Sequence, residues 1–288
     1  MSQTRRVIAQ GGAELFAGSA YDPTAAGGLV AWQRPSGALL RRGGSTGGLP
    51  GTHPALGGGR IAWLEGSTIV VADAGTLRPL ERHAAPGAGV LAVSDSLLAW
   101  RTRDAAGTDR IWVVVPGTPP RLLLELAAPQ ELGRPALVGG ALLTHLAGPA
   151  GSRVLGVDVA TGAQTVLREE AGAQVSNPAT DGGRLLYVHA TGRTQELRAG
   201  PVAPRAPADD EVLLVHSSPG RRDREHEHGR RRHRHRGRRP KLPPRARPGV
   251  VATLWTTALT GDSAYVTRLR AIRGERRTAD ILRVPIAD

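Results

Sequence analysis

The sequence predicts an all-β protein, a six-bladed β-propeller built from four-stranded blades. Three observations favour this fold class. A hairpin pattern recurs along the chain, its spacing matches the length of one blade, and apolar runs of four to six residues lie between Gly, Pro and Asp. The 38 glycines and 22 prolines among 288 residues also suit many short strands joined by turns.

The repeat is clearest in residues 177–188, which predict a strand, an Asp-Gly turn and a second strand. Its anchors are Gly183, a Pro five residues earlier and an aromatic residue four residues later. Five further segments fit the same three columns without gaps. The anchors of all six segments are Pro23, Gly28, Trp32; Pro54, Gly59, Trp63; Leu91, Ser96, Trp100; Pro135, Gly140, Thr144; Pro178, Gly183, Tyr187; and Thr256, Gly261, Tyr265.

The spacing of the third column sets the number of blades. Its successive members are 31, 37, 44, 43 and 78 residues apart. The last interval contains the 30-residue run 219–248, and 78 − 30 leaves 48 residues. Four-stranded blades repeat about every 40–50 residues. We therefore expect six blades in one domain, with the Trp/Tyr column packed between them.

Each repeat supplies two more strands after its hairpin. In the fourth repeat, for example, residues 154–158 form an apolar third strand and residues 164–167 a fourth. The sixth repeat ends after its third strand at residue 284, so its fourth strand must come from elsewhere. We expect residues 7–9, which have no other partner, to complete the last blade and close the ring.

The repeat resembles the blade motif of TolB-like propellers. That motif has a Pro, an Asp-Gly turn and an apolar strand with an aromatic residue, matched here by Pro178, Asp181-Gly182 and Tyr187. A strand that ends in an acid before a turn, as at Asp158, is a further likeness. The resemblance covers residues 20–285 apart from the run 219–248. It implies the propeller fold and, since such proteins are commonly exported, an envelope location.

The start of the sequence differs from that expectation. Residues 1–12 carry charges but lack the apolar run of a signal peptide, and no apolar run in the chain approaches the ~20 residues that span a bilayer. As written, the sequence predicts a cytoplasmic protein, and we expect a monomer. The alternative is a periplasmic or secreted protein whose true start lies upstream. Cysteine is absent, which excludes disulfides and thiol chemistry.

The positive charge is concentrated in the run 219–248. The whole chain carries +13, whereas this run has 13 basic and three acidic residues, or +10. The rest has 38 − 13 = 25 basic and 25 − 3 = 22 acidic residues, or +3. Because the run has few apolar side chains and many like charges, we predict a disordered insert between the fifth and sixth blades.

Three hypotheses remain open for this insert. It is a solvated loop without function, an electrostatic site for nucleic acid or an anionic surface, or a metal site. The scarcity of lysine, one against 37 arginines, indicates the codon bias of a GC-rich bacterial genome and favours the first hypothesis. The basic candidates are Arg230, Arg231, Arg232, Arg234, Arg236, Arg238 and Arg239. The weaker metal candidates are His226, His228, His233 and His235.

One further column predicts a site at the central channel. The position before the Pro column is occupied by Asp22, His53, Val90, Arg134, Asn177 and Trp255. It starts the innermost strand of each blade, so these side chains should surround one mouth of the channel. Such chemical variety is typical of a recognition site rather than of repeated structural positions. We therefore predict a ligand site made by Asp22, His53, Arg134, Asn177 and Trp255, the alternative being that each residue only caps its own strand.

The sequence contains no recognisable enzyme motif. It has no nucleophile elbow, no phosphate-binding glycine loop and no zinc-protease helix, and it points to no cofactor. We predict a non-catalytic binding or scaffold protein that recognises a protein or small ligand at the channel mouth. The first alternative is a propeller-fold hydrolase or lyase, in which Asp22 and His53 would form the acid–base pair. The second is a tether to nucleic acid or an anionic surface through the insert.

Overall fold

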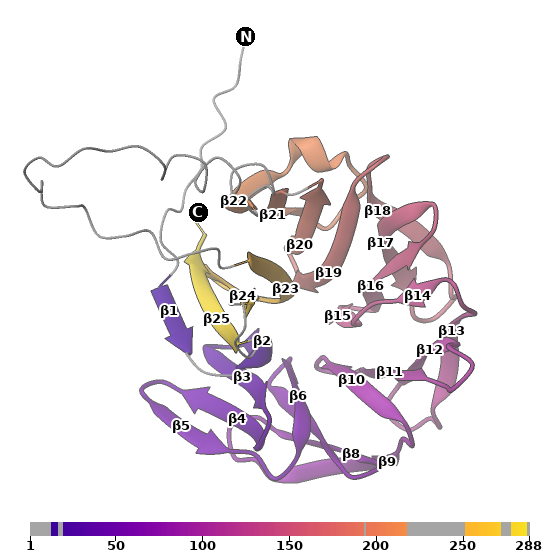
Figure 1. Ribbon diagram of the computed structural model, residues 1–288. Coiled ribbons are helices and arrows are strands. Elements are labelled where there is room, and N and C mark those ends of the chain that lie inside the picture. Colours follow the sequence, from indigo (N-terminus) through magenta and orange to yellow (C-terminus); the bar gives the residue numbers. More distant parts are fainter. Residues whose placement is uncertain (1–12, 17–19, 193, 218–250, 272–277, 287–288) are drawn as a thin grey trace, which may run out of the picture.

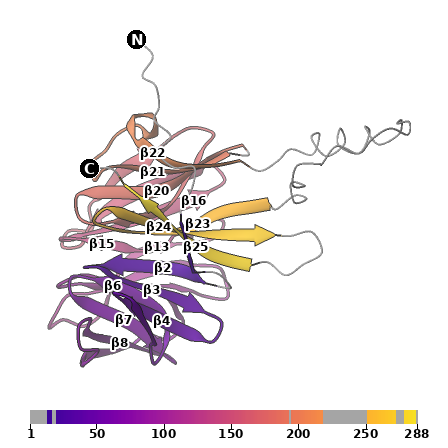
Figure 2. The same cartoon turned by 90° about the vertical axis from the view of Figure 1, so that its left-hand side faces the viewer.

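Six antiparallel sheets surround a central axis in the computed structural model, which describes residues 13–16, 20–192, 194–217, 251–271 and 278–286 (Figure 1). This arrangement confirms the six-bladed β-propeller. Figure 2 shows the ring from its side, with the long strands of the sixth blade extending beyond one face. The one helix in these residues is the short 3-10 turn η1 (Pro207–Asp209), so none is long enough to cross a membrane.

In the first five blades the strands follow one another in sequence from the axis outward, whereas the outermost strand of the sixth blade is β1. The first three blades consist of β2 (Tyr21–Ala26), β3 (Leu29–Arg34), β4 (Gly37–Arg42) and β5 (Ser45–Gly48); β6 (Thr52–Gly57), β7 (Arg60–Glu65), β8 (Thr68–Asp73) and β9 (Pro79–Ala84); and β10 (Ala88–Val93), β11 (Leu98–Arg103), β12 (Asp109–Val114) and β13 (Arg121–Leu126). The next two consist of β14 (Glu131–Leu132), β15 (Ala136–Val138), β16 (Ala141–Gly148), β17 (Gly151–Asp158) and β18 (Gln164–Glu169); and β19 (Gln174–Thr180), β20 (Arg184–Thr191), β21 (Thr194–Pro201) and β22 (Glu211–Ser217). The sixth consists of β23 (Val251–Thr260), β24 (Ser263–Ala271), β25 (Thr278–Pro285) and β1 (Ala13–Phe16).

The last blade is completed by a strand from the N-terminal part of the chain. β1 pairs antiparallel with β25, with Ala13 opposite Arg283 and Phe16 opposite Ile281. The predicted closure by an N-terminal strand is therefore confirmed, but the strand is Ala13–Phe16. Residues 7–9, to which the sequence assigned this position, lie outside the described residues. Thus the strand that completes blade six lies directly before blade one in the sequence, with only four residues between β1 and β2.

The aromatic column packs between neighbouring blades, as the sequence predicts. Trp63 lies in one buried cluster with Ala31 and Leu40 of blade one, and Tyr187 lies in another with Leu143 of blade four. The repeat is less regular in the sixth blade, whose first hairpin is two residues longer. There Thr257 pairs with Val266 at the level where Thr24 pairs with Ala31.

This longer hairpin corrects the anchor predicted for the sixth repeat. Thr267, rather than Tyr265, takes the place that Trp32 has in blade one. The gap-free comparison of repeats missed the shift because a two-residue insertion keeps the alternation of a strand unchanged. Tyr265 packs instead against Trp32 at the junction between the last and first blades.

Candidate functional site

The innermost strands carry a bulge at the level of the predicted site. In β2, Asp22 and Pro23 lie between the pairs Tyr21–Gln33 and Thr24–Ala31, so two residues oppose one. β6, β19 and β23 show the same two-against-one pairing. In blade three the extra residue is in β10, and in blade four the strand is interrupted between β14 and β15. The predicted column is therefore a ring of irregular backbone.

The bulge explains part of the chemical variety of this column. Asp22, His53 and Asn177 have φ angles of +52°, +52° and +54°. Asp, Asn and His are the non-glycine residues that most often adopt this left-handed conformation. Three of the predicted site residues are thus suited to the backbone at their positions, as well as to any ligand. This backbone requirement supports the alternative stated for these positions, in which each residue serves its own strand.

At three junctions a side chain of the preceding blade accepts a backbone N–H group in the bulge or directly before it. Gln33 Oε1 accepts from the N–H of His53 at 2.7 Å. His145 Nδ1 accepts from the N–H of Asn177 at 3.1 Å, and Gln195 Oε1 accepts from the N–H of Leu254 at 2.8 Å. These contacts connect neighbouring blades beside the channel, which fixes the positions of the inner strands.

His145 is a buried member of this set that must be neutral to function. Its Nδ1 accepts a hydrogen bond, so the ring proton lies on Nε2. Burial, helped by the nearby Arg101 cation, lowers the pKa of His145 to about 4. Gly133 packs against the ring so closely that a Cβ there would lie 1.9 Å from Nδ1. His145 is therefore a structural residue that holds the N–H group of Asn177.

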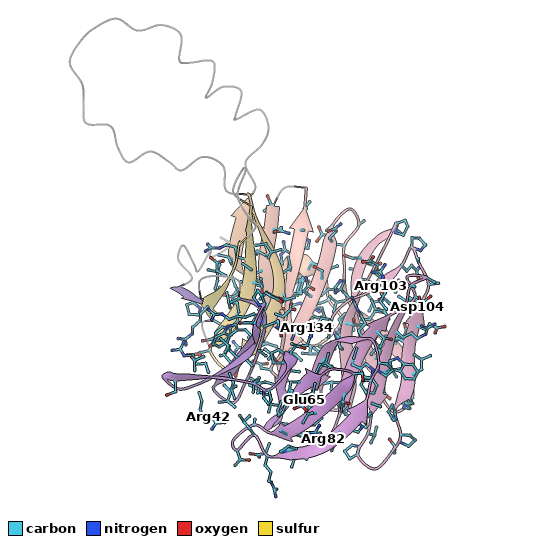
Figure 3. The ribbon with its side chains drawn as sticks, turned by 60° about the horizontal axis from the view of Figure 1, so that its bottom comes forward. Arg42, Glu65, Arg82, Arg103, Asp104 and Arg134 are labelled. Carbon is cyan, nitrogen blue, oxygen red and sulfur yellow. The ribbon has the colours of Figure 1, made fainter. Side chains whose placement is uncertain are left out.

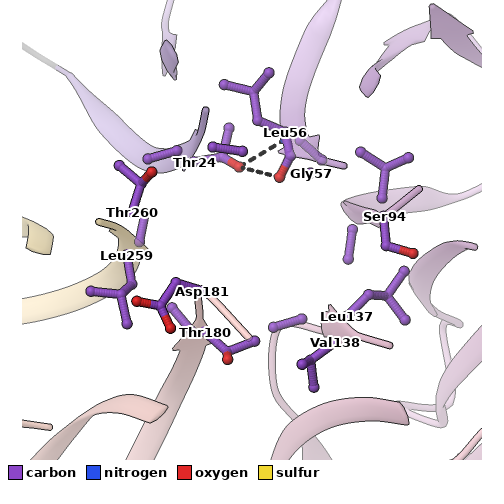
Figure 4. Close-up of a pocket in the computed structure, with 18 of the residues that line it drawn as sticks. Thr24, Leu56, Gly57, Ser94, Leu137, Val138, Thr180, Asp181, Leu259 and Thr260 are labelled. Atoms are coloured by element: carbon purple, nitrogen blue, oxygen red, sulfur yellow. Dashed lines mark hydrogen bonds between the residues drawn. The ribbon is translucent and has the colours of Figure 1, made fainter. Parts of the chain in front are cut away.

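A cavity of about 620 Å³ occupies the centre of the ring (Figure 4). The six innermost strands line it from the level of the Pro column to the first hairpin turn of each blade. Its wall is formed mainly by small and apolar residues, among them Leu56, Leu137, Val138 and Leu259. Thr24 Oγ1 is already engaged, because it accepts from the N–H of Leu56 at 2.8 Å.

Arg134 is the one cation among the described residues that line the cavity. Figure 3 shows it near the middle of the molecule, whereas Arg42 and Arg82 lie toward the rim. Its Nη1 lies 3.9 Å from Oδ1 of Asp22. Blade four and blade one are opposite members of a six-blade ring, so this ion pair crosses the channel. Asp22 and Arg134 together limit the cavity at its bulge end.

The guanidinium of Arg134 is poorly satisfied. The side chain is only 12% exposed, and its Nη1 has no hydrogen-bond partner in the part of the chain that the structure describes. Burial lowers the pKa of Arg134, and the Asp22 carboxylate opposes that effect. An arginine nevertheless remains protonated in a protein, so a positive charge persists at this end of the cavity.

His53 completes a group of three at the bulge end. Burial lowers the pKa of His53, the Asp22 carboxylate raises it and the Arg134 cation lowers it further. The imidazole is therefore neutral at pH 7, and its Nδ1 lies 3.1 Å from Thr52 Oγ1. The structure thus places Asp22, His53 and Arg134 close enough for their charges to interact.

The other predicted mouth residues contribute differently. The carbonyl of Asn177 accepts from Thr257 Oγ1 at 2.5 Å, and its side-chain amide lies 3.4 Å from Ser176 Oγ. These contacts join blade five to blade six and favour a structural role. Trp255 is in β23, but its side chain lies outside what the structure describes.

At the opposite end of the cavity, one hairpin-turn acid makes backbone contacts. Asp181 Oδ1 accepts from the N–H groups of Gly183 and Arg184 at 3.1 and 2.8 Å. Such Asx-type bonding agrees with a turn-forming role for Asp181. The arginine and histidine candidates of residues 219–248 lie outside the described residues. Within the described ones, no group of three or more His, Asp or Glu side chains could hold a metal ion.

No family model matches the sequence, and no curated protein matches it significantly. Solved structures with a similar fold do exist, at low sequence identity. Acylaminoacyl peptidase from Pyrococcus horikoshii has a TM-score of 0.52 and 11% identity, over 91% of this chain and 46% of that one. TolB from Acinetobacter baumannii has a TM-score of 0.49 and 11% identity, over 89% of this chain and 61% of that one.

A third similar structure has nearly the same extent as this chain. It is the β-propeller domain of the Trilobed protease from Pyrococcus furiosus, described as having an open velcro topology, with a TM-score of 0.45 and 11% identity over 96% of this chain and 97% of that one. By contrast, the chain spans about half the length of the peptidase and under two thirds of TolB. The protein is thus a six-bladed β-propeller with distant structural similarity to TolB and to peptidase propellers.

Proposed function

We propose that the protein is a non-catalytic binding propeller that holds a ligand in its central channel. The observation that supports this function best is the 620 Å³ cavity, with a wall of small residues that presents both polar and apolar surface and a single cation at one end. Ligand sites typically have volumes of about 300–1,000 Å³ and a few charged or polar groups that orient the ligand. The ligand is a small molecule or a segment of a partner protein that enters between the hairpin turns.

The rigidity of the inner strands favours this function. Hydrogen bonds from Gln33, His145 and Gln195 connect successive blades at the bulge end of the channel. Thr24 Oγ1 adds a contact between the first and second blades nearer the hairpin turns. A cavity held in this way needs little ordering when a ligand binds, which conserves binding free energy.

The alternatives receive less support. The peptidases of similar fold share 11–12% of residues with this chain, which supports the fold but not their activity. Asp22 faces Arg134 as well as His53, which makes the two a poor acid–base pair. A tether through residues 219–248 predicts salt-sensitive binding to nucleic acid or anionic vesicles that is lost when those residues are deleted.

A substitution that fills the channel tests the proposed function. Thr180 lines the cavity, so Thr180→Trp should obstruct it. The matched control is Thr46→Trp, on the exposed outer strand β5. We would screen acids, bases, neutral fragments and short peptides by ligand-observed NMR. Ligands that bind the wild type and Thr46→Trp but not Thr180→Trp would support the function. Binding that is equal in all three proteins would contradict it.

A further inference from the structure

Arg134 offers hydrogen bonds that the described protein does not use. A donor and a carboxylate oxygen must approach to about 3.2 Å to form a hydrogen bond. Asp22 Oδ1, 3.9 Å from Nη1, is beyond this limit, and Nη1 has no other partner in the described residues. The pair therefore neutralises charge across the channel without satisfying the guanidinium. A donor of this kind, buried and unbonded, costs about 1–3 kcal/mol unless something accepts from it.

The missing acceptor has a definite chemistry. A guanidinium presents parallel N–H groups that match the two oxygens of a carboxylate. A doubly charged group fits less well, because Asp22 lies beside Arg134 and Asp95 and Asp181 lie along the cavity. One carboxylate thus matches the single cation. The rest of the wall is formed mainly by small residues and contains no second cation among the described residues, so it suits a ligand whose remaining part is uncharged.

We propose that the channel binds an organic carboxylate, with its two oxygens on Arg134 and its uncharged body toward the hairpin turns. This inference rests on the proposed function and specifies its ligand class. The carboxylate belongs either to a free small acid or to the C-terminus of a peptide. Asp22 competes with it for the guanidinium, so the two members of the pair should have opposite effects on binding.

Calorimetric titrations of matched probes test the inference. The probes are 4-methylpentanoate and its amide, the peptide Ala-Ala-Leu with a free or an amidated C-terminus, and inorganic phosphate. We expect each free acid to bind at least about tenfold more tightly than its amide, because the amide loses a charge-assisted hydrogen bond. Phosphate should bind more weakly than the acids. Binding by both acids identifies the carboxylate alone as the determinant, and binding by the peptide alone identifies a C-terminus.

Variants of the ion pair provide the decisive comparison. Arg134→Gln should weaken binding of the acids at least about tenfold and remove the preference over amides. Asp22→Asn should strengthen it several-fold, since the competing carboxylate is gone while Asn still tolerates the left-handed backbone. Arg42→Gln is the control, because Arg42 donates to Ala74 away from the channel, and should bind like the wild type. Thermal melts establish that all three variants are folded.

The failures of the two proposals differ. The carboxylate inference is overturned if no acid binds, if amides bind as well as acids, or if Arg134→Gln binds acids like the wild type. In these cases the channel function still stands when Thr180→Trp abolishes binding of any screened ligand. If acids bind Thr180→Trp as tightly as the wild type, both proposals are wrong.

Discussion

Two arginine–aspartate pairs in this protein differ in how completely their hydrogen bonds are made. Arg168 on β18 is fully buried and donates to both carboxylate oxygens of Asp210, the residue after η1. Its other N–H groups donate to the carbonyls of Leu167, Pro201 and Ala203. Since Arg168 belongs to blade four and Asp210 to blade five, this pair fastens two blades together.

The pair formed by Arg134 and Asp22 also joins two blades but is incomplete. Its atoms stay 3.9 Å apart, and Nη1 of Arg134 donates to nothing in the described residues. Both arginines are largely removed from water, so burial alone does not distinguish them. The difference teaches that a buried charged group whose hydrogen bonds are all made has a structural role. A buried charged group that lines a cavity and has a donor without an acceptor is a candidate for ligand binding.

The largest expected effect comes from breaking the complete pair. Arg168→Met should lower the free energy of unfolding by about 3–5 kcal/mol, because it leaves the Asp210 carboxylate buried without its main partner. Denaturant titration measures this loss, and Asp210→Asn should lower stability in the same direction. A loss below about 1 kcal/mol, the range of exposed pairs, would show that the buried contacts are not tight in solution.

A second large effect should appear when the pH is lowered. His145 has a folded pKa of about 4 and an ordinary value of 6.5, so the unfolded chain binds the proton first as the pH falls. Stability is full above pH 6.5 and declines toward pH 4, by on the order of 3 kcal/mol at about 1.4 kcal/mol per pKa unit.

The control for this pH effect is His145→Gln. Gln33 already accepts the equivalent N–H group of His53 at another blade junction, so glutamine can keep the contact without titrating. The difference in stability between wild type and variant should change between pH 7 and pH 4. If urea titrations show a constant difference over that range, His145 is not the group responsible.

The sequence predicts some of these features better than others. The blades follow from hairpins that repeat within a few dozen residues, and the resulting fold class is confirmed. The cross-channel pair joins residues 134 − 22 = 112 positions apart and emerges only from the closed ring. Its members were in the predicted column because the repeat places equivalent positions at one level. Their hydrogen bonds could not be predicted, since these depend on tenths of an ångström.

The hydrogen bonds between neighbouring blades show most clearly what the sequence does not predict. Gln33, His145 and Gln195 serve the same purpose, yet their partners follow 20, 32 and 59 residues later. Gln33 and His145 do occupy the same repeat position, one residue after the third column, and their partners His53 and Asn177 both precede the Pro column. Their residue types differ, however, and Gln195 acts from the third strand of its blade, so the repeat does not predict which side chains make these contacts. The bulges were missed for a related reason, because one extra residue in a strand is visible only in the register of its partner.

A smaller effect should follow from removing one contact of the complete pair. Tyr187 donates to Asp210 Oδ2 at 2.8 Å, and burial together with that carboxylate raises the pKa of Tyr187. Tyr187→Phe keeps the ring against Arg168 and removes only the hydroxyl. Because Asp210 retains its bonds from Arg168, the loss should be about 1.5–2 kcal/mol, as for one hydrogen bond to a charged group. A loss comparable to that of Arg168→Met would mean that the hydroxyl organises the whole cluster.

The smallest effect is expected at the incomplete pair, where stability and binding should separate. Asp22→Asn keeps a residue suited to φ +52° and should change the free energy of unfolding by less than about 0.5 kcal/mol, whereas Asp22→Ala should cost about 1–2 kcal/mol through backbone strain. Arg134→Gln should cost less than about 1 kcal/mol, because the ion pair makes no hydrogen bond that the variant could lose. Denaturant titrations of the three variants beside Arg168→Met test this directly. If Arg134→Gln lost as much stability as Arg168→Met, the cross-channel pair would hold the ring together, and its unbonded donor would no longer point to a ligand.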